Sequence, residues 1–111
     1  MTVRIVRTRQ FRVDADQIAQ HYLEEAGLDV ALRFLDELEQ VVERLAAHPG
    51  LGSARYAQVE MPWLRSSAMS SFPYVVFFGK TDGLVRLWRV LHGRRDLPQV
   101  LRDADFPDDE T

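Results

Sequence analysis

The sequence predicts an α+β fold: an N-terminal strand, an antiparallel helical hairpin, and a three-stranded antiparallel meander that completes one small sheet. Three observations predict it. Apolar and basic residues alternate over residues 3–8, apolar residues recur at three- and four-residue spacing from 11 to 45, and after residue 50 this helical period gives way to two apolar runs on either side of a glycine-rich turn.

The first half of the chain gives one strand and one helix before Gly27. Val3 to Thr8 has the alternation of a half-buried strand. We expect Asp14 or Asp16 to cap the helix that follows, and Gly27 suits the left-handed position at its end. The expected apolar face of this helix consists of Phe11, Ala15, Ile18, Ala19, Tyr22 and Ala26.

A second helix is expected between Asp29, which can cap it, and Pro49-Gly50, which ends it. Its apolar stripe consists of Ala31, Phe34, Leu35, Leu38, Val41, Val42 and Leu45. The connection between the two helices is very short, so they should form an antiparallel hairpin. This hairpin is expected to pack on one face of a largely antiparallel sheet.

Three strands follow. Met61 to Ser67 is the first, although it contains Pro62, and Tyr74 to Phe78 is apolar on both faces, as a central strand is. Residues 79–83 (Gly-Lys-Thr-Asp-Gly) are expected to form a hairpin turn that leads into a long strand, Leu84 to His92.

The length of 111 residues fits a single domain, which we place at residues 1–102. Leu97 to Arg102 is expected to form a short terminal helix or strand after Gly93 breaks the last long strand. Residues 103–111 carry five acidic residues and no base, and we expect a disordered tail there.

Composition excludes several classes of protein. With 46% apolar residues the chain is globular, and without cysteine it has no disulfide, thiolate nucleophile or sulfur-ligated zinc. No apolar run approaches the roughly 20 residues of a membrane helix, and the N-terminus has no signal-peptide pattern. We therefore expect a cytoplasmic protein without a membrane partner.

The net charge of −3 conceals a segregation of charge along the chain. Residues 14–48 carry nine acids and two arginines, whereas residues 49–102 carry eight bases and three acids. Thirteen of the 14 bases are arginine, the side chain that binds carboxylates and phosphates in two-point contacts.

Enzyme motifs are largely missing from the sequence. Its three histidines, His21, His48 and His92, lie near no nucleophile elbow and in no metal-ligand spacing, and there is no glycine-rich phosphate loop. We expect neither a metal nor a cofactor.

The arginines of the second half are the more informative group. They fall on the expected strands and at their ends: Arg55, Arg65, Arg86, Arg89, Arg94, Arg95 and Arg102. Several are placed to meet on the sheet face or edge that the helices leave free. Such a surface can grip RNA phosphates, stabilise the transition state of RNA cleavage, or dock an acidic protein groove.

The order of several short segments resembles the RelE/ParE toxin superfamily. The stretch from Arg89 to Asp96, Arg-Val-Leu-His-Gly-Arg-Arg-Asp, looks like the C-terminal signature of the ParE branch. Matching pieces precede it in order: Tyr22, Ala31 to Phe34, His48 to Gly52, Arg55, Leu64-Arg65, and Phe72 to Phe77. The resemblance covers roughly residues 3–102. It implies a toxin of a bacterial type II toxin–antitoxin system, with the same order of elements.

The superfamily divides by target, and the resemblance implies one of two activities. RelE-like members cleave mRNA on ribosomes, whereas ParE-like members inhibit DNA gyrase. This chain departs from the RelE pattern: Phe72 to Tyr74 replaces Tyr-Arg, the region of Arg65 lacks lysines, and Val100-Leu101 stands where many members have a tyrosine. Near the arginines only His92 and Tyr74 are plausible proton carriers.

We therefore favour a ParE-like toxin that binds gyrase, is neutralised by a ParD-like antitoxin, and has no specific DNA binding of its own. The expected target-binding residues are Arg65, Arg89, His92, Arg94, Arg95 and Arg102. The alternative is a RelE-like endoribonuclease, whose catalytic residues would be Arg65, Arg89, His92 and Arg94.

Overall fold

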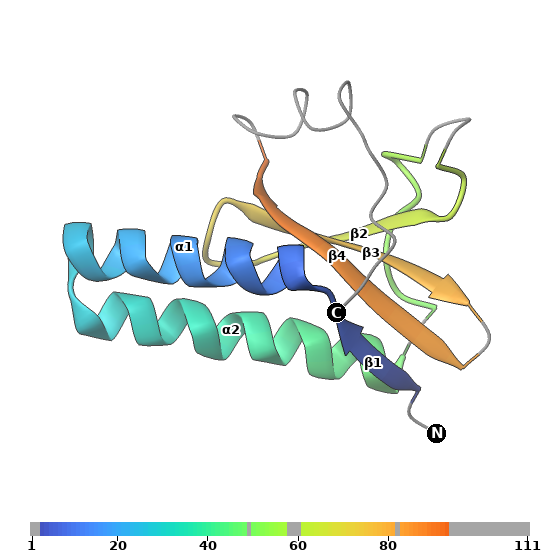
Figure 1. The fold of residues 1–111 in the computed structure, drawn as a ribbon, viewed down its shortest axis with the longest axis horizontal. Coiled ribbons are helices and arrows are strands. Elements are labelled where there is room, and N and C mark those ends of the chain that lie inside the picture. The colour runs from blue at the N-terminus through green and yellow to red at the C-terminus, as the bar shows by residue number, and fades with distance from the viewer. Residues whose placement is uncertain (1–2, 49, 58–60, 82, 94–111) are drawn as a thin grey trace.

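The fold has a helical layer packed against a single sheet (Figure 1). The computed structural model describes residues 3–48, 50–57, 61–81 and 83–93. In chain order its elements are β1 (Arg4–Arg7), α1 (Arg9–Ala26), α2 (Leu28–Ala47), β2 (Leu64–Ala68), β3 (Tyr74–Thr81) and β4 (Leu84–His92). This order confirms the predicted α+β fold.

The sheet is mixed, with the strand order β1-β4-β3-β2. The meander β2-β3-β4 is antiparallel, as predicted, while β1 pairs in parallel with β4, Arg4 opposite Leu84 and Arg7 opposite Leu87. The helical hairpin connects β1 to β2, which lies at the opposite edge of the sheet. The meander then runs back toward β1, so that β4 lies beside β1 and parallel to it. A register shift between Phe77 and Phe78 interrupts the β3–β4 ladder.

The first helix begins earlier than predicted, because Thr8 is its N-cap rather than Asp14 or Asp16. The Thr8 hydroxyl accepts a hydrogen bond from the Phe11 N–H at 3.2 Å and donates one to the Leu87 carbonyl at 2.8 Å. One buried side chain therefore caps α1 and fastens it to β4. Asp14 is thereby left inside the helix, on its buried side.

The second helix also starts earlier than predicted, with its N-cap two residues before Asp29. Its N-cap is Gly27. Asp29 lies within the first turn, where a carboxylate still interacts favourably with the helix dipole. Gly27 has a positive φ of +97°, which glycine adopts readily, but its ψ of 169° lies outside the left-handed helical conformation predicted for it, and its N–H donates to the Tyr22 carbonyl. A single residue thus ends α1 and starts α2, which makes the hairpin tight.

The main core lies between the helices and the sheet. Of the apolar stripe predicted for α2, all but Leu35 are buried. The α1 residues Phe11, Ala15 and Ile18 share one core with Phe34, Leu38, Val41, Val42 and Leu45. The sheet contributes Tyr74, Val76 and Phe78 from β3 and Val85, Leu87 and Val90 from β4. Phe34 is completely buried, and its ring lies edge-on to those of Phe72 and Tyr74.

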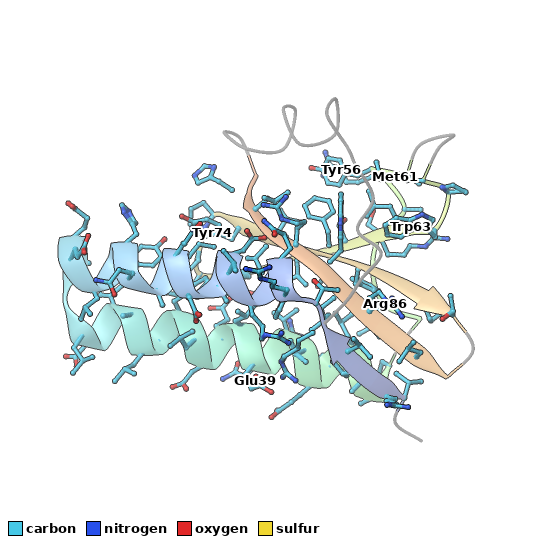
Figure 2. All side chains as sticks on the ribbon, in the orientation of Figure 1. Glu39, Tyr56, Met61, Trp63, Tyr74 and Arg86 are labelled. Atoms are coloured by element: carbon cyan, nitrogen blue, oxygen red, sulfur yellow. The ribbon has the colours of Figure 1, made fainter. Side chains whose placement is uncertain are left out.

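A second, smaller core covers part of the opposite face of the sheet, which we call the distal face. It contains Met61, Leu64, Phe77, Trp88 and Leu91, with Tyr56 packed against it. Figure 2 shows Tyr56, Met61 and Trp63 gathered beside the strands, away from the helices. The segment before β2 is held there by paired hydrogen bonds between the backbones of Ser53 and Ser66.

The two largest differences at strand boundaries are the start of β2 and the end of β3. The strand expected from Met61 starts at Leu64, because residues 61–64 form a turn in which the Leu64 N–H donates to the Met61 carbonyl. Pro62 has no N–H to give to a ladder, so a turn accommodates it better than a strand. The expected turn at 79–83 is shorter, since β3 continues to Thr81 and β4 begins at Leu84.

The expected element at Leu97–Arg102 and the expected acidic tail at 103–111 lie outside the described residues. The single-domain boundary at residue 102 therefore stays a prediction. Neither helix of the described chain combines the length and apolarity needed to cross a bilayer.

Candidate interaction surface

Charge separates between the two layers of the fold. Within their described bounds, the four strands contain six cationic side chains and no acidic one. The two helices contain nine acidic side chains and four arginines. The segregation seen along the sequence is therefore one between a basic sheet and an acidic helical layer.

Several strand cations are committed to contacts inside the fold. The Arg7 guanidinium donates to both carboxylate oxygens of Glu39, at 2.8 and 3.0 Å. The Arg65 side chain folds back toward the start of β2, where its Nη1 donates to the carbonyls of Pro62 and Leu64 at 3.0 and 2.9 Å. These contacts join β1 to α2 and close the turn before β2.

Arg89, predicted as a site residue, is tied to Asp14 of α1. Its Nε lies 2.7 Å from Asp14 Oδ2 and its Nη2 lies 3.0 Å from Oδ1, a two-point contact. The same Oδ2 accepts the N–H of Val90 at 3.0 Å. The parallel partner β1 ends opposite Leu87, so beyond that point α1 supplies the acceptor that a neighbouring strand would have given.

His92 lies at the end of β4. Its ring is edge-on to that of Tyr74, with 5.4 Å between the ring centroids. Both residues line a mostly apolar hollow of about 290 Å³ near the connection from β2 to β3. Among the described residues that line it, only His92 and Tyr74 carry an ionisable group. The two predicted proton carriers are therefore neighbours.

The predicted site residues do not gather in one place. Arg65 lies opposite Phe78, and His92 lies opposite Tyr74, four residues along β3 and on the other side of it. Strand geometry separates these backbone positions by about 13 Å along the strands and about 10 Å across them. Arg94, Arg95 and Arg102 lie outside the described residues. No cluster of potential metal ligands occurs in the part of the chain that the structure describes.

Two apolar surfaces were missed by the sequence interpretation. Leu28, Leu32 and Leu35 of α2 are 38–59% exposed and share one face of the helix at spacings of four and three residues. Leu23 of α1 is also exposed, at 42%. On the distal face, Trp63 is 36% exposed. The leucine spacing was readable in the sequence, but a stripe of this kind does not reveal whether the fold covers it.

Glu37 connects α2 to the turn between β2 and β3, where its Oε2 accepts the N–H groups of Ser70 and Ser71 at 2.6 and 3.0 Å. Desolvation raises the pKa of Glu37. Hydrogen bonds from Ser71 and Ser70 and the charge of Arg44 together lower it by more, so that the pKa lies below its ordinary value of 4.5. Folding therefore favours the ionised carboxylate.

This direction predicts how Glu37 affects stability with pH. A carboxyl group with a lowered folded-state pKa stabilises the fold above its unfolded pKa, near 4.5, and loses that contribution as pH falls through the folded value. Glu37→Gln should therefore cost about 0.5–1.5 kcal/mol at pH 7 and much less at pH 3. Thermal melts at both pH values, with Glu43→Gln as the control, measure the difference. An equal cost at both pH values would contradict this role.

The fold and its charged layers define a small α+β protein with the strand and helix order of the toxins that the sequence resembles. The family model for the ParE toxin of the type II toxin–antitoxin system parDE matches residues 5–97. The chain belongs to this family. It is similar to Toxin ParE3 of Caulobacter vibrioides, with 33% identity over 98 residues that cover 88% of this chain and 94% of the relative.

A solved structure supports the fold. A chain described as the chromosomal ParDE TA system from P. aeruginosa superposes with a TM-score of 0.70 at 22% identity, covering 82% of this chain and 96% of the other. The similarity confirms the predicted order of strand, helical hairpin and meander. The resemblance to ParE toxins inferred from short sequence segments is confirmed as well.

Proposed function

We propose that this ParE-family toxin arrests growth by binding DNA gyrase, and that a cognate ParD-like antitoxin neutralises it. The observation that carries the choice of binding over RNA cleavage is the placement of the cations. Arg89 holds a buried carboxylate, Arg65 holds its own turn, and His92 lies four residues along β3 from Arg65 and on the other side of that strand. General acid–base cleavage needs its proton carriers and its charged groups around one phosphate.

The proposed target is tested by direct binding. Purified gyrase holoenzyme is passed over the immobilised toxin, with the toxin–antitoxin complex immobilised as the control. We expect gyrase to bind the free toxin and to bind the complex much more weakly. Equal binding to both surfaces, or none to either, would contradict the proposal.

The antitoxin part of the proposal rests on the helical hairpin. Leu28, Leu32 and Leu35 offer an apolar helix face to a partner segment, and exposed apolar surface of this kind marks protein interaction sites. The family belongs to a two-component system, which supplies the partner class. Co-expression with the product of a cognate antitoxin gene should yield a tight complex and restore growth. A free toxin that never co-purifies with that product would count against neutralisation by binding.

His92 separates the two activities. If the toxin acts by binding elsewhere, His92→Gln should leave growth arrest close to that of the wild type, because glutamine keeps a polar side chain of similar size beside Tyr74. If the protein were a nuclease with His92 as its proton carrier, the same change would lower its rate roughly 10²-fold or more. Growth arrest after induction, with thermal melts to confirm folding, gives the answer.

A further inference from the structure

The distal face carries exposed arginines next to exposed aromatic rings. On β1, Val3 and Ile5 pack toward the helices and Arg7 pairs with Glu39 of α2, so the alternating Arg4 and Val6 face the other way. On β4, Val85 and Leu87 belong to the helix-side core, which places Arg86 on the distal face with Trp88. Arg4 and Arg86 are both exposed.

Trp63 is held flat against this face. A Cβ atom placed on Gly79 would stand 2.8 Å from Trp63 Cε3 and 3.3 Å from its Cζ3, so the indole lies directly on the glycine backbone. Trp88 supports it edge-on, with ring centroids 5.8 Å apart. The indole is therefore fixed on one side while 36% of the residue stays exposed.

Arg86 stands beside this indole. It is the cross-strand neighbour of Gly79, the residue that Trp63 covers. Arg4 lies opposite Leu84, which makes it the diagonal neighbour of Arg86 at about 7–8 Å between their Cα atoms. Two exposed arginines and one immobilised indole thus share this part of the distal face; Figure 2 labels Trp63 and Arg86.

A second arginine–aromatic pair lies further along the same face. The Arg55 guanidinium carbon is 4.9 Å from the centre of the Tyr56 ring. That ring packs against Phe77 of the smaller core, with 5.5 Å between the ring centroids. Arginine, tryptophan and tyrosine are the residues that most often dominate protein interfaces, because they combine apolar area with directed polar contacts. The distal face therefore has the composition of a protein-binding surface.

We propose that Arg4, Arg86 and Trp63, with Arg55 and Tyr56 at their rim, form the surface through which the toxin grips an acidic surface on its protein target. This inference rests on the proposed function, in which the toxin acts by binding. The charge separation between the layers supports it, since an acidic helical layer behind a basic sheet orients the molecule toward an acidic partner. A net charge of −3 disfavours a nucleic acid as the partner.

Charge reversal at Arg86 tests the inference. Arg86→Glu should abolish growth arrest in cells and weaken binding of purified gyrase holoenzyme roughly 30-fold or more, the scale of a central interface arginine. Arg86→Lys should keep part of both. Arg33→Glu, the same reversal at an exposed position of α2, is the matched control and should behave as the wild type. If Arg86→Glu impairs folding in thermal melts, Arg4→Glu on the edge strand replaces it.

The remaining outcomes separate this inference from the proposed function. If Arg86→Glu abolishes arrest while the wild type leaves gyrase unbound, the distal face is supported and gyrase as the target falls. Undiminished arrest by Arg86→Glu overturns the inference, and so does loss of antitoxin binding alone, which would assign the face to the antitoxin. Arg86-dependent binding of a 30-nucleotide single-stranded DNA probe would also overturn it. A wild type that arrests no growth overturns both.

Discussion

Replacing Asp14 by alanine is expected to lower the free energy of unfolding by about 3–5 kcal/mol, the usual cost of leaving one member of a buried ion pair alone. The Asp14 side chain is 7% exposed and that of Arg89 is 20% exposed, so water replaces the lost carboxylate poorly. The Val90 N–H loses its acceptor in the same variant. Chemical denaturation of the wild type and the variant measures the loss.

Asp16→Ala is the matched control for this result. Asp16 lies on the same helix, two residues away, and is exposed, so its removal should change stability by less than about 0.5 kcal/mol. The double variant Asp14→Ala, Arg89→Ala should lose clearly less than the two single losses added together, since each single change strands the other group. Full additivity would show that the pair does not hold α1 to β4.

Gly52→Ala is expected to cost about 2–6 kcal/mol, for two reasons that act together. Gly52 has φ of +113°, a conformation that costs an L-residue about 1–3 kcal/mol. A methyl group there would also stand 2.6 Å from Cζ of Phe78, a completely buried ring, and overpacking a core costs a similar amount.

Gly50 provides the comparison for Gly52. Nothing lies within 4 Å of a Cβ atom placed on Gly50, and its φ is outside the left-handed region. Gly50→Ala should therefore be neutral, or stabilise the fold by up to about 1 kcal/mol through the unfolded chain. Equal losses for the two variants would mean that the segment after α2 is not anchored where the structure has it.

Most of the fold could be predicted from local patterns, because the periods of helix and strand are local properties. The apolar stripe of α2 and the strand Leu84–His92 have the predicted residues. The pairing of β1 was not predictable in this way, since Arg4–Arg7 meets Leu84–Leu87 about 80 residues later in the chain. No local pattern states which edge of the meander a lone strand joins.

The interaction surface was less predictable, since charge alone does not show which partner a side chain finds. Asp14 follows Phe11 by three residues and precedes Ile18 by four, so it lies on the buried stripe of α1, a sign that a carboxylate there needs a cationic partner. That partner, Arg89, is 75 residues away. Trp63 gave no sequence signal either, because its place depends on the bare backbone of Gly79 across the sheet.

Under the proposed function, this toxin stops gyrase by binding and does not cleave RNA. Supercoiling of relaxed plasmid by purified gyrase, titrated with the purified toxin, tests this most directly. In parallel, mRNA on translating ribosomes is treated with the same toxin preparation. We expect supercoiling to fall as toxin is added, to recover when the antitoxin is supplied, and the mRNA to stay intact. Full supercoiling at a large excess of toxin, together with cleaved mRNA, would contradict the account.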